Sequence, residues 1–149
     1  IFISNYVQLL FPNKGDEINE SLLIEGLKKI PIKDSIILSN TAKEGYSGRT
    51  YRNTYLTAFT QHDHYLANIN DYHWRTNKET LQRYLDYQEI FDFNQNNRGI
   101  YKPNSINLIR KRKISHLILK KVNNNSKEYK YPGLKLIYSN KKWSFYKVN

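Results

Sequence analysis

Apolar side chains occur along the chain in two patterns, a spacing of three or four residues and short continuous runs, which predict alternating helices and strands. Between residues 17 and 30 they recur every three or four positions, so we predict an amphipathic helix that Pro31 ends. Residues 34–40 follow as a strand-like segment. Its short apolar run, with Ile36, Ile37 and Leu38, suits a strand buried on both faces. Residues 114–120 form a second such run and predict a neighbouring strand, with Leu117, Ile118 and Leu119 at its centre.

The middle of the chain gives weaker signals. Residues 41–54 are polar, contain Gly45 and Gly48, and predict a loop. Residues 55–59 alternate and predict a second strand, whereas residues 60–76 predict irregular structure. Asn77 is a good N-cap for a helix whose inner face we predict from spacing to be Leu81, Tyr84, Leu85, Gln88 and Phe91.

The last third predicts one more helix and a closing pair of strands. A loop at 94–99 precedes Pro103, which favours the start of a helix running to the strand at 114–120. After a polar, Asn-rich stretch, residues 134–138 and 143–148 form a predicted β-hairpin.

Helices that alternate with buried strands indicate the α/β class. We predict a three-layer α/β/α sandwich with a mostly parallel sheet and a C-terminal antiparallel hairpin at one edge. The 149 residues suit one domain, to which we assign residues 17–149. The chain begins with Ile1 and contains no Met, so we expect an upstream segment, and we interpret residues 1–16 as the lead-in from it.

Composition narrows the chemistry. The absence of Cys excludes disulfides, thiolate zinc sites and a Cys nucleophile. The net charge of +11 is uneven, because residues 1–74 carry 7 Lys/Arg against 8 Asp/Glu, and residues 75–149 carry 17 against 5. This asymmetry favours an anionic partner, such as phospholipid or nucleic acid, although a merely solvated basic surface would have the same composition.

The order of these elements resembles a known family. The resemblance rests on Ile-Pro-x-x-Asp-Ser-Ile-Ile-Leu-Ser-Asn at 30–40, Lys-Ile-Ser-His-Leu-Ile-Leu at 113–119, and Leu-Lys-Leu-Ile-Tyr-Ser-Asn-Lys-Lys-Trp-Ser-Phe-Tyr-Lys-Val at 134–148. This pattern is similar to the soluble C-terminal domain of polytopic bacterial membrane glycosyltransferases of the C superfamily, which use sugars linked to lipid phosphates.

The resemblance implies a soluble domain on the extracytoplasmic side of the cell membrane, following the last transmembrane helix. In that superfamily the catalytic acidic residue lies in an early loop among the transmembrane helices, and nothing in this chain corresponds to that loop. The implied function is therefore a non-catalytic auxiliary domain, without cofactor, that positions the acceptor or the lipid-linked donor. Its partner would be the remainder of the parent protein, whose own enzymatic activity stays open.

A different function remains possible from the residues themselves. A basic module that binds a polyanion or nucleic acid would also explain the charge. The neutral N-terminal half and the absence of a nucleic-acid-binding motif make nucleic acid the less favoured partner.

Two stretches are candidate contact sites for anionic ligands. Tyr46, Arg49, Tyr51 and Arg52 interleave aromatic rings with cations, a combination that stacks on sugar rings or bases and pairs with phosphates. They follow the first buried strand, and α/β proteins bind ligands at the carboxyl ends of such strands. Arg110, Lys111, Arg112 and Lys113 are the densest basic run, explained either by the helix dipole or by contact with an anionic surface.

Histidines offer a weaker alternative, a metal site. His62 and His64 would share one face of an extended segment and could bind Zn²⁺ or Cu²⁺ together with His73. Such spacing is common by chance, so we expect a hydrogen-bonded polar segment and no metal.

Overall fold

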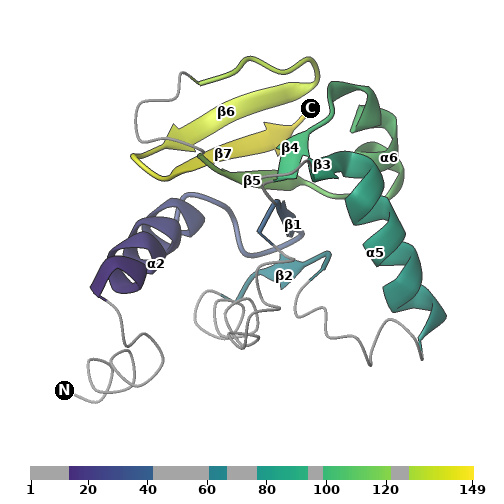
Figure 1. Cartoon of the computed structure of the whole chain (residues 1–149). Coiled ribbons are helices and arrows are strands. Elements are labelled where there is room, and N and C mark those ends of the chain that lie inside the picture. The colour runs from purple at the N-terminus through teal and green to yellow at the C-terminus, as the bar shows by residue number, and fades with distance from the viewer. Residues whose placement is uncertain (1–13, 42–60, 67–76, 94–98, 122–127) are drawn as a thin grey trace.

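The computed structural model (Figure 1) describes residues 14–41, 61–66, 77–93, 99–121 and 128–149, with side chains from residue 21 onward. Its centre is a five-stranded sheet with the strand order β2-β1-β5-β7-β6. The strands are β1 (Ile36–Ser39), β2 (Asp63–His64), β5 (His116–Lys120), β6 (Leu134–Ser139) and β7 (Trp143–Val148). β2, β1 and β5 run parallel, while β7 is antiparallel to both β5 and β6. The α/β class and the hairpin at one edge of the sheet are thus confirmed.

Strand β1 is central because both its faces are apolar. Ile37 and Leu38 point to opposite faces, and neither is exposed to solvent. In the parallel pairing with β5, Ile37 lies opposite His116 and Leu38 opposite Leu117. The two apolar runs predicted from the sequence are therefore neighbours.

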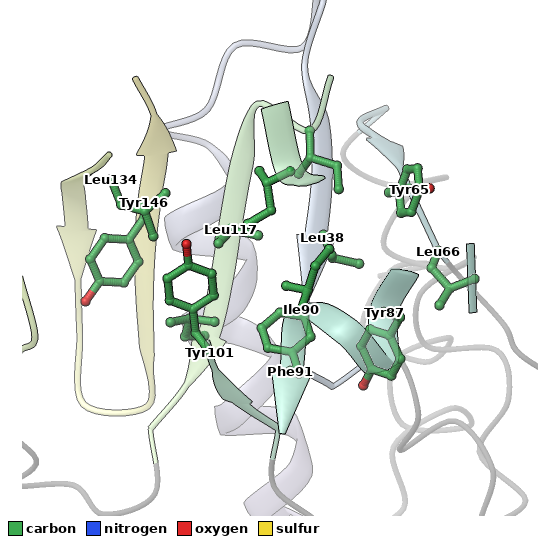
Figure 2. Close-up of a cluster of buried hydrophobic side chains, with 13 residues drawn as sticks. Leu38, Tyr65, Leu66, Tyr87, Ile90, Phe91, Tyr101, Leu117, Leu134 and Tyr146 are labelled. Atoms are coloured by element: carbon green, nitrogen blue, oxygen red, sulfur yellow. The ribbon is translucent and has the colours of Figure 1, made fainter. Parts of the chain in front are cut away.

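Each face of the sheet has its own apolar core. Helix α2 (Lys14–Leu27) packs on one face through Leu23 and Leu27, which join Ile118, Trp143 and Phe145. Gly26 allows this close approach, since a Cβ there would lie 2.0 Å from Cζ of the Phe145 ring. On the other face, helices α5 (Lys78–Ile90) and α6 (Ile106–Lys111) contribute to the cluster in Figure 2.

Helix α5 confirms its predicted cap and part of its predicted inner face, since Phe91 is buried and Tyr84 packs against the core, whereas Gln88 is exposed. The Asn77 side chain accepts from the backbone N–H of Glu79 at 2.9 Å and of Thr80 at 3.3 Å. The fully buried residues are Asp86, Tyr87 and Ile90, whereas Leu85 is 48% exposed. The spacing of apolar residues did not predict that Asp86 is buried. Its carboxylate is stabilised in the interior by the polar partners described below.

Other boundaries also differ from expectation. Phe91–Phe93 (β3) and Gly99–Tyr101 (β4) form a separate two-stranded antiparallel sheet that the sequence did not predict. The irregular structure predicted for 60–76 is wrong at β2, and the strand predicted at 55–59 lies outside the described residues. A 3₁₀ turn, η2 (Pro103–Ser105), begins the helical segment at Pro103 as predicted. In the part of the chain that the structure describes, no helix has the length and apolarity to cross a membrane.

Candidate functional site

In α/β folds, ligands usually bind at the carboxyl ends of parallel strands, so the carboxyl end of β1 is the first place to look for a site. The described polar groups there form hydrogen bonds between helices and strands. Tyr46, Arg49, Tyr51 and Arg52, predicted to follow this strand, lie outside the described residues. Asn40, at the strand end, is buried; its Nδ2 donates to the Gly99 carbonyl at 2.9 Å, and its Oδ1 accepts from the Lys120 N–H at 2.9 Å. Tyr87 Oη donates to the Asn40 carbonyl at 3.0 Å. Asn40 thus ties β1 to β5, β4 and α5.

A second polar junction surrounds Asp86 on the buried face of α5. The carboxylate accepts from the Tyr65 hydroxyl at 2.5 Å and from Gln82 Nε2 at 3.0 Å. Arg112, at the end of α6, approaches it with two nitrogens, Nε at 2.7 Å and a terminal nitrogen at 3.2 Å. This geometry joins α5, α6 and the segment after β2, so Arg112 is a structural cation rather than a free surface charge.

Electrostatics at this junction keep the carboxylate charged. Burial opposes ionisation of Asp86, but hydrogen bonds from Tyr65, Arg112 and Gln82 outweigh it and hold the pKa of Asp86 below its ordinary value. Burial, and then the bond to Asp86, raise the pKa of the Tyr65 hydroxyl. A carboxylate held ionised by donors on three sides is a poor general base, because its lone pairs are already engaged.

Replacing Arg112 with Gln should destabilise the domain at neutral pH and raise the pKa of Asp86. The substitution leaves a buried carboxylate without its cation, so protonation of Asp86 becomes the easier state. The loss of stability relative to the parent chain should therefore be smaller at pH 5 than at pH 7, as measured by urea unfolding of both chains at both pH values. Lys111→Gln, one residue away and exposed, serves as the control. An equal loss in both variants, or a loss independent of pH, would contradict the assigned role.

Three histidines line the face of the sheet that carries α2, near its amino edge. His62 is buried, and its Nε2 lies 2.9 Å from the Ile30 carbonyl at the end of α2. Burial, followed by the nearby His62, lowers the pKa of His64 to about 4. Burial also lowers the pKa of His116, with smaller contributions from Lys147 and His62. His64 and His116 are therefore neutral at pH 7.

The predicted alternation of the His segment is confirmed, since His62 and His64 are turned inward and Asp63 is exposed. His73 lies outside the described residues. Among the residues that the structure describes, no group of three or more His, Asp or Glu side chains is placed to hold a metal ion.

Exposed cations gather where α6, β6 and β7 meet, and we call this group the basic end. Arg110, Lys111 and Lys113 follow one another around the end of α6, and all three are exposed. Lys135 and Lys147 lie directly opposite each other at the start of β6 and the end of β7. Figure 1 shows these segments together at one end of the sheet, with the β6–β7 turn at the other.

Three hydrogen bonds place the end of α6 beside the ends of the strands. Arg110 Nε donates to the Asn149 carbonyl at 3.0 Å, and the N–H of Asn149 donates to the Gly133 carbonyl at 2.9 Å. The Val148 N–H also donates to the Ser115 carbonyl at 2.8 Å, two residues after Lys113. The basic run predicted from sequence is thus extended by two lysines from the hairpin.

The distribution of charge along the chain explains why this end is basic. Residues 99–149 carry 13 Lys/Arg and a single acidic residue, Glu128, whereas residues 1–98 carry 11 Lys/Arg and 12 Asp/Glu. Within the described residues, Glu128 approaches Lys121, with 3.9 Å between Oε1 and Nζ. The described part contains no ion pair to any cation of the basic end.

Sequence analysis missed Lys135 and Lys147 because they are isolated in the chain. Each alternates with apolar residues in its own strand, which reads as an ordinary solvated position. Only the hairpin register places them opposite each other. Equal distance from the predicted turn would pair Lys135 with Tyr146, and an irregularity between Leu136 and Tyr138 shifts the register so that Lys135 faces Lys147.

With this geometry established, the chain can be compared with known proteins. No protein-family model, curated protein or solved structure matches it.

Proposed function

We propose that this is a non-catalytic auxiliary domain of a membrane glycosyltransferase-like protein. It would lie on the extracytoplasmic side of the cell membrane and position the acceptor or the lipid-linked donor. Its partners would be the remainder of the parent protein and the phosphate of the lipid-linked sugar. The proposal includes a three-layer α/β/α arrangement, which the separate apolar cores on the two faces of the sheet support.

One observation carries the proposal, namely the contrast between inner and outer polar groups. The buried Asn40 and Asp86 are engaged in hydrogen bonds between elements. The cations of the basic end, by contrast, are exposed and available to phosphate. Such an arrangement favours holding an anion over transforming it.

The test uses a short-chain polyprenyl-phosphate sugar that is soluble without membrane. We expect its phosphate to perturb the backbone amide resonances around Arg110 and Lys147 in a titration followed by NMR. We expect no release or transfer of the sugar during prolonged incubation with the 149-residue chain, with and without added acceptors. Turnover would overturn the non-catalytic assignment, and an unperturbed spectrum would overturn the positioning role.

The charge asymmetry also supports a second candidate, a module that binds a polyanion. The cheapest discriminator is a single-stranded RNA oligonucleotide in the same titration. If the oligonucleotide bound at lower concentration than the sugar phosphate and displaced it, the polyanion-binding function would replace the first proposal.

A further inference from the structure

We propose that the basic end is the surface with which the domain rests on an anionic phospholipid bilayer. The inference deepens the proposed function, on which it rests, by specifying which side of the domain faces the membrane. The contact residues would be Arg110, Lys111, Lys113, Lys135 and Lys147.

Four of the five cations lie on α6, β6 and β7, and Lys113 lies between α6 and β5. Lys135 and Lys147 belong to the face of the sheet that carries α2, and α6 packs on the other face, so the cations border this end of the sheet from both faces. Lys135 and Lys147 are held opposite each other by the β6–β7 ladder, and Lys113 is fixed in a left-handed backbone conformation with φ 57°. Arg110 is anchored to the end of β7 through the Asn149 carbonyl. The positions of these charges are therefore set by the fold and not by a flexible tail.

Like charges directly opposite each other in a β-ladder repel, and Lys135 and Lys147 form such a pair. The neighbour of Lys147 on the other side is His116, which burial keeps neutral. Among the described acidic residues, Asp34 and Asp63 lie at the amino ends of β1 and β2. Strand β5 separates both of them from the β6–β7 hairpin. An external anion is thus the counter-charge that best complements this end.

A bilayer can engage all five cations at once, whereas the phosphate of one lipid-linked sugar contacts only the cations nearest to it. The side chains are exposed, and they lie around the end of the sheet, with Arg110 and Lys111 on α6 and the other three on the strands or before β5. Charges spread in this way each contact a different headgroup, and their contributions add up across the surface. A single phosphate would instead need convergent donors in one place.

The opposite end of the sheet supplies a control with the same charge. Lys121, Lys141 and Lys142 lie together there, since the Lys121 N–H donates to the Lys142 carbonyl at 2.7 Å. At this end Glu25 of α2 accepts from the Tyr138 hydroxyl at 2.8 Å, and Glu128 Oε1 lies 3.9 Å from Lys121 Nζ. The lysines at this end therefore have carboxylates near them, whereas in the described part of the chain no cation of the basic end forms an ion pair.

The experiment compares two triple variants of the 149-residue chain that remove equal charge. One carries Lys113→Gln, Lys135→Gln and Lys147→Gln, and the other Lys121→Gln, Lys141→Gln and Lys142→Gln. Binding is measured by co-sedimentation with phosphatidylcholine vesicles in which about a third of the lipid is phosphatidylglycerol, at about 50 mM salt. An exposed lysine near such a surface strengthens binding about fivefold, so the basic-end variant should bind about 100-fold more weakly. The control variant should stay within about fivefold of the parent chain.

Each other outcome counts against the inference. Equal losses in the two variants would mean that only net charge matters, and a greater loss in the control would place the opposite end on the membrane. Equally strong binding by the parent chain to pure phosphatidylcholine would exclude recognition of anionic lipid. Full displacement by low-millimolar glycerol phosphate would show that the basic end binds phosphate and not the bilayer surface. Both variants should retain the parent chain's thermal unfolding transition. The sugar-phosphate titration does not involve a bilayer, so it can fail or succeed independently.

Discussion

Replacing Asn40 with alanine should lower the free energy of unfolding by about 2–4 kcal/mol. The substitution leaves the Gly99 carbonyl and the Lys120 N–H without the partners that the Asn40 side chain provides. An unpaired buried polar group costs about 1–3 kcal/mol, and two such groups are exposed to this loss. The quantity to measure is the urea midpoint with its slope, since a shift at constant slope reports stability alone.

Asn107 provides the matched control for this experiment, because it is an exposed asparagine on α6. Asn107→Ala should change stability by no more than about 0.5 kcal/mol. Asn40→Asp tests the direction of the amide, because it would place a carboxylate oxygen against the Gly99 carbonyl. We expect Asp at this position to be worse than Ala at pH 7. If Asn40→Ala were as mild as the control, the junction would not hold the four elements together.

Acid should destabilise the domain well above the pH at which carboxylates titrate. The pKa of His64 is lowered to about 4 in the folded chain, so the unfolded chain binds a proton first as the pH falls below about 6.5. The contribution of neutral His64 is complete above that pH and is lost between about 6.5 and 4, at up to about 1.4 kcal/mol per pH unit. His116, whose pKa is lowered as well, acts in the same direction.

Urea unfolding between pH 7.5 and pH 4.5 measures this effect, and His64→Gln is the variant that isolates it. The variant should show a shallower decline, because glutamine has no proton to take up. The charged neighbours act in opposite senses, since His62 lowers the pKa of His64 while Asp63 raises it. The pKa of Asp86 is lowered, so loss of its charge destabilises only below its unfolded value of about 4 and does not enter this window. Identical pH profiles for parent and variant would show that His64 is not the responsible group.

The elements predicted well from sequence are those whose structure depends on residues close together in the chain. Ile37 and Leu38 lie in a run with no polar interruption, which is compatible only with burial on both faces, and they are indeed buried. Asn77 satisfies the first free N–H groups of its own helix, so the cap requires no knowledge of the rest of the chain. The closing hairpin is likewise a local structure.

The failures arise where distant residues determine the environment. Asp86 was left out of the predicted inner face of its helix because a carboxylate is buried only when partners exist, and its partners Tyr65 and Arg112 are 21 and 26 residues away. The same ion pair changes the reading of the basic run, in which one of four cations faces inward. The basic end was only partly predicted, because Lys147 belongs to it through its pairing with residues on the adjacent strands.

The position of β1 in the sheet has a consequence for how the chain is made. Within the described residues, β1 pairs with the two-residue β2 and with β5, and the bond from the Ile36 N–H to Ser115 Oγ spans 79 residues. A ribosome that adds about 5–20 residues per second needs about 4–16 s to synthesise that interval. During that time β1 cannot form its backbone hydrogen bonds with β5. By contrast, β5, β6 and β7 pair within one stretch of chain and can form as soon as it has been synthesised. The C-terminal strands then provide the template onto which the earlier half of the domain folds.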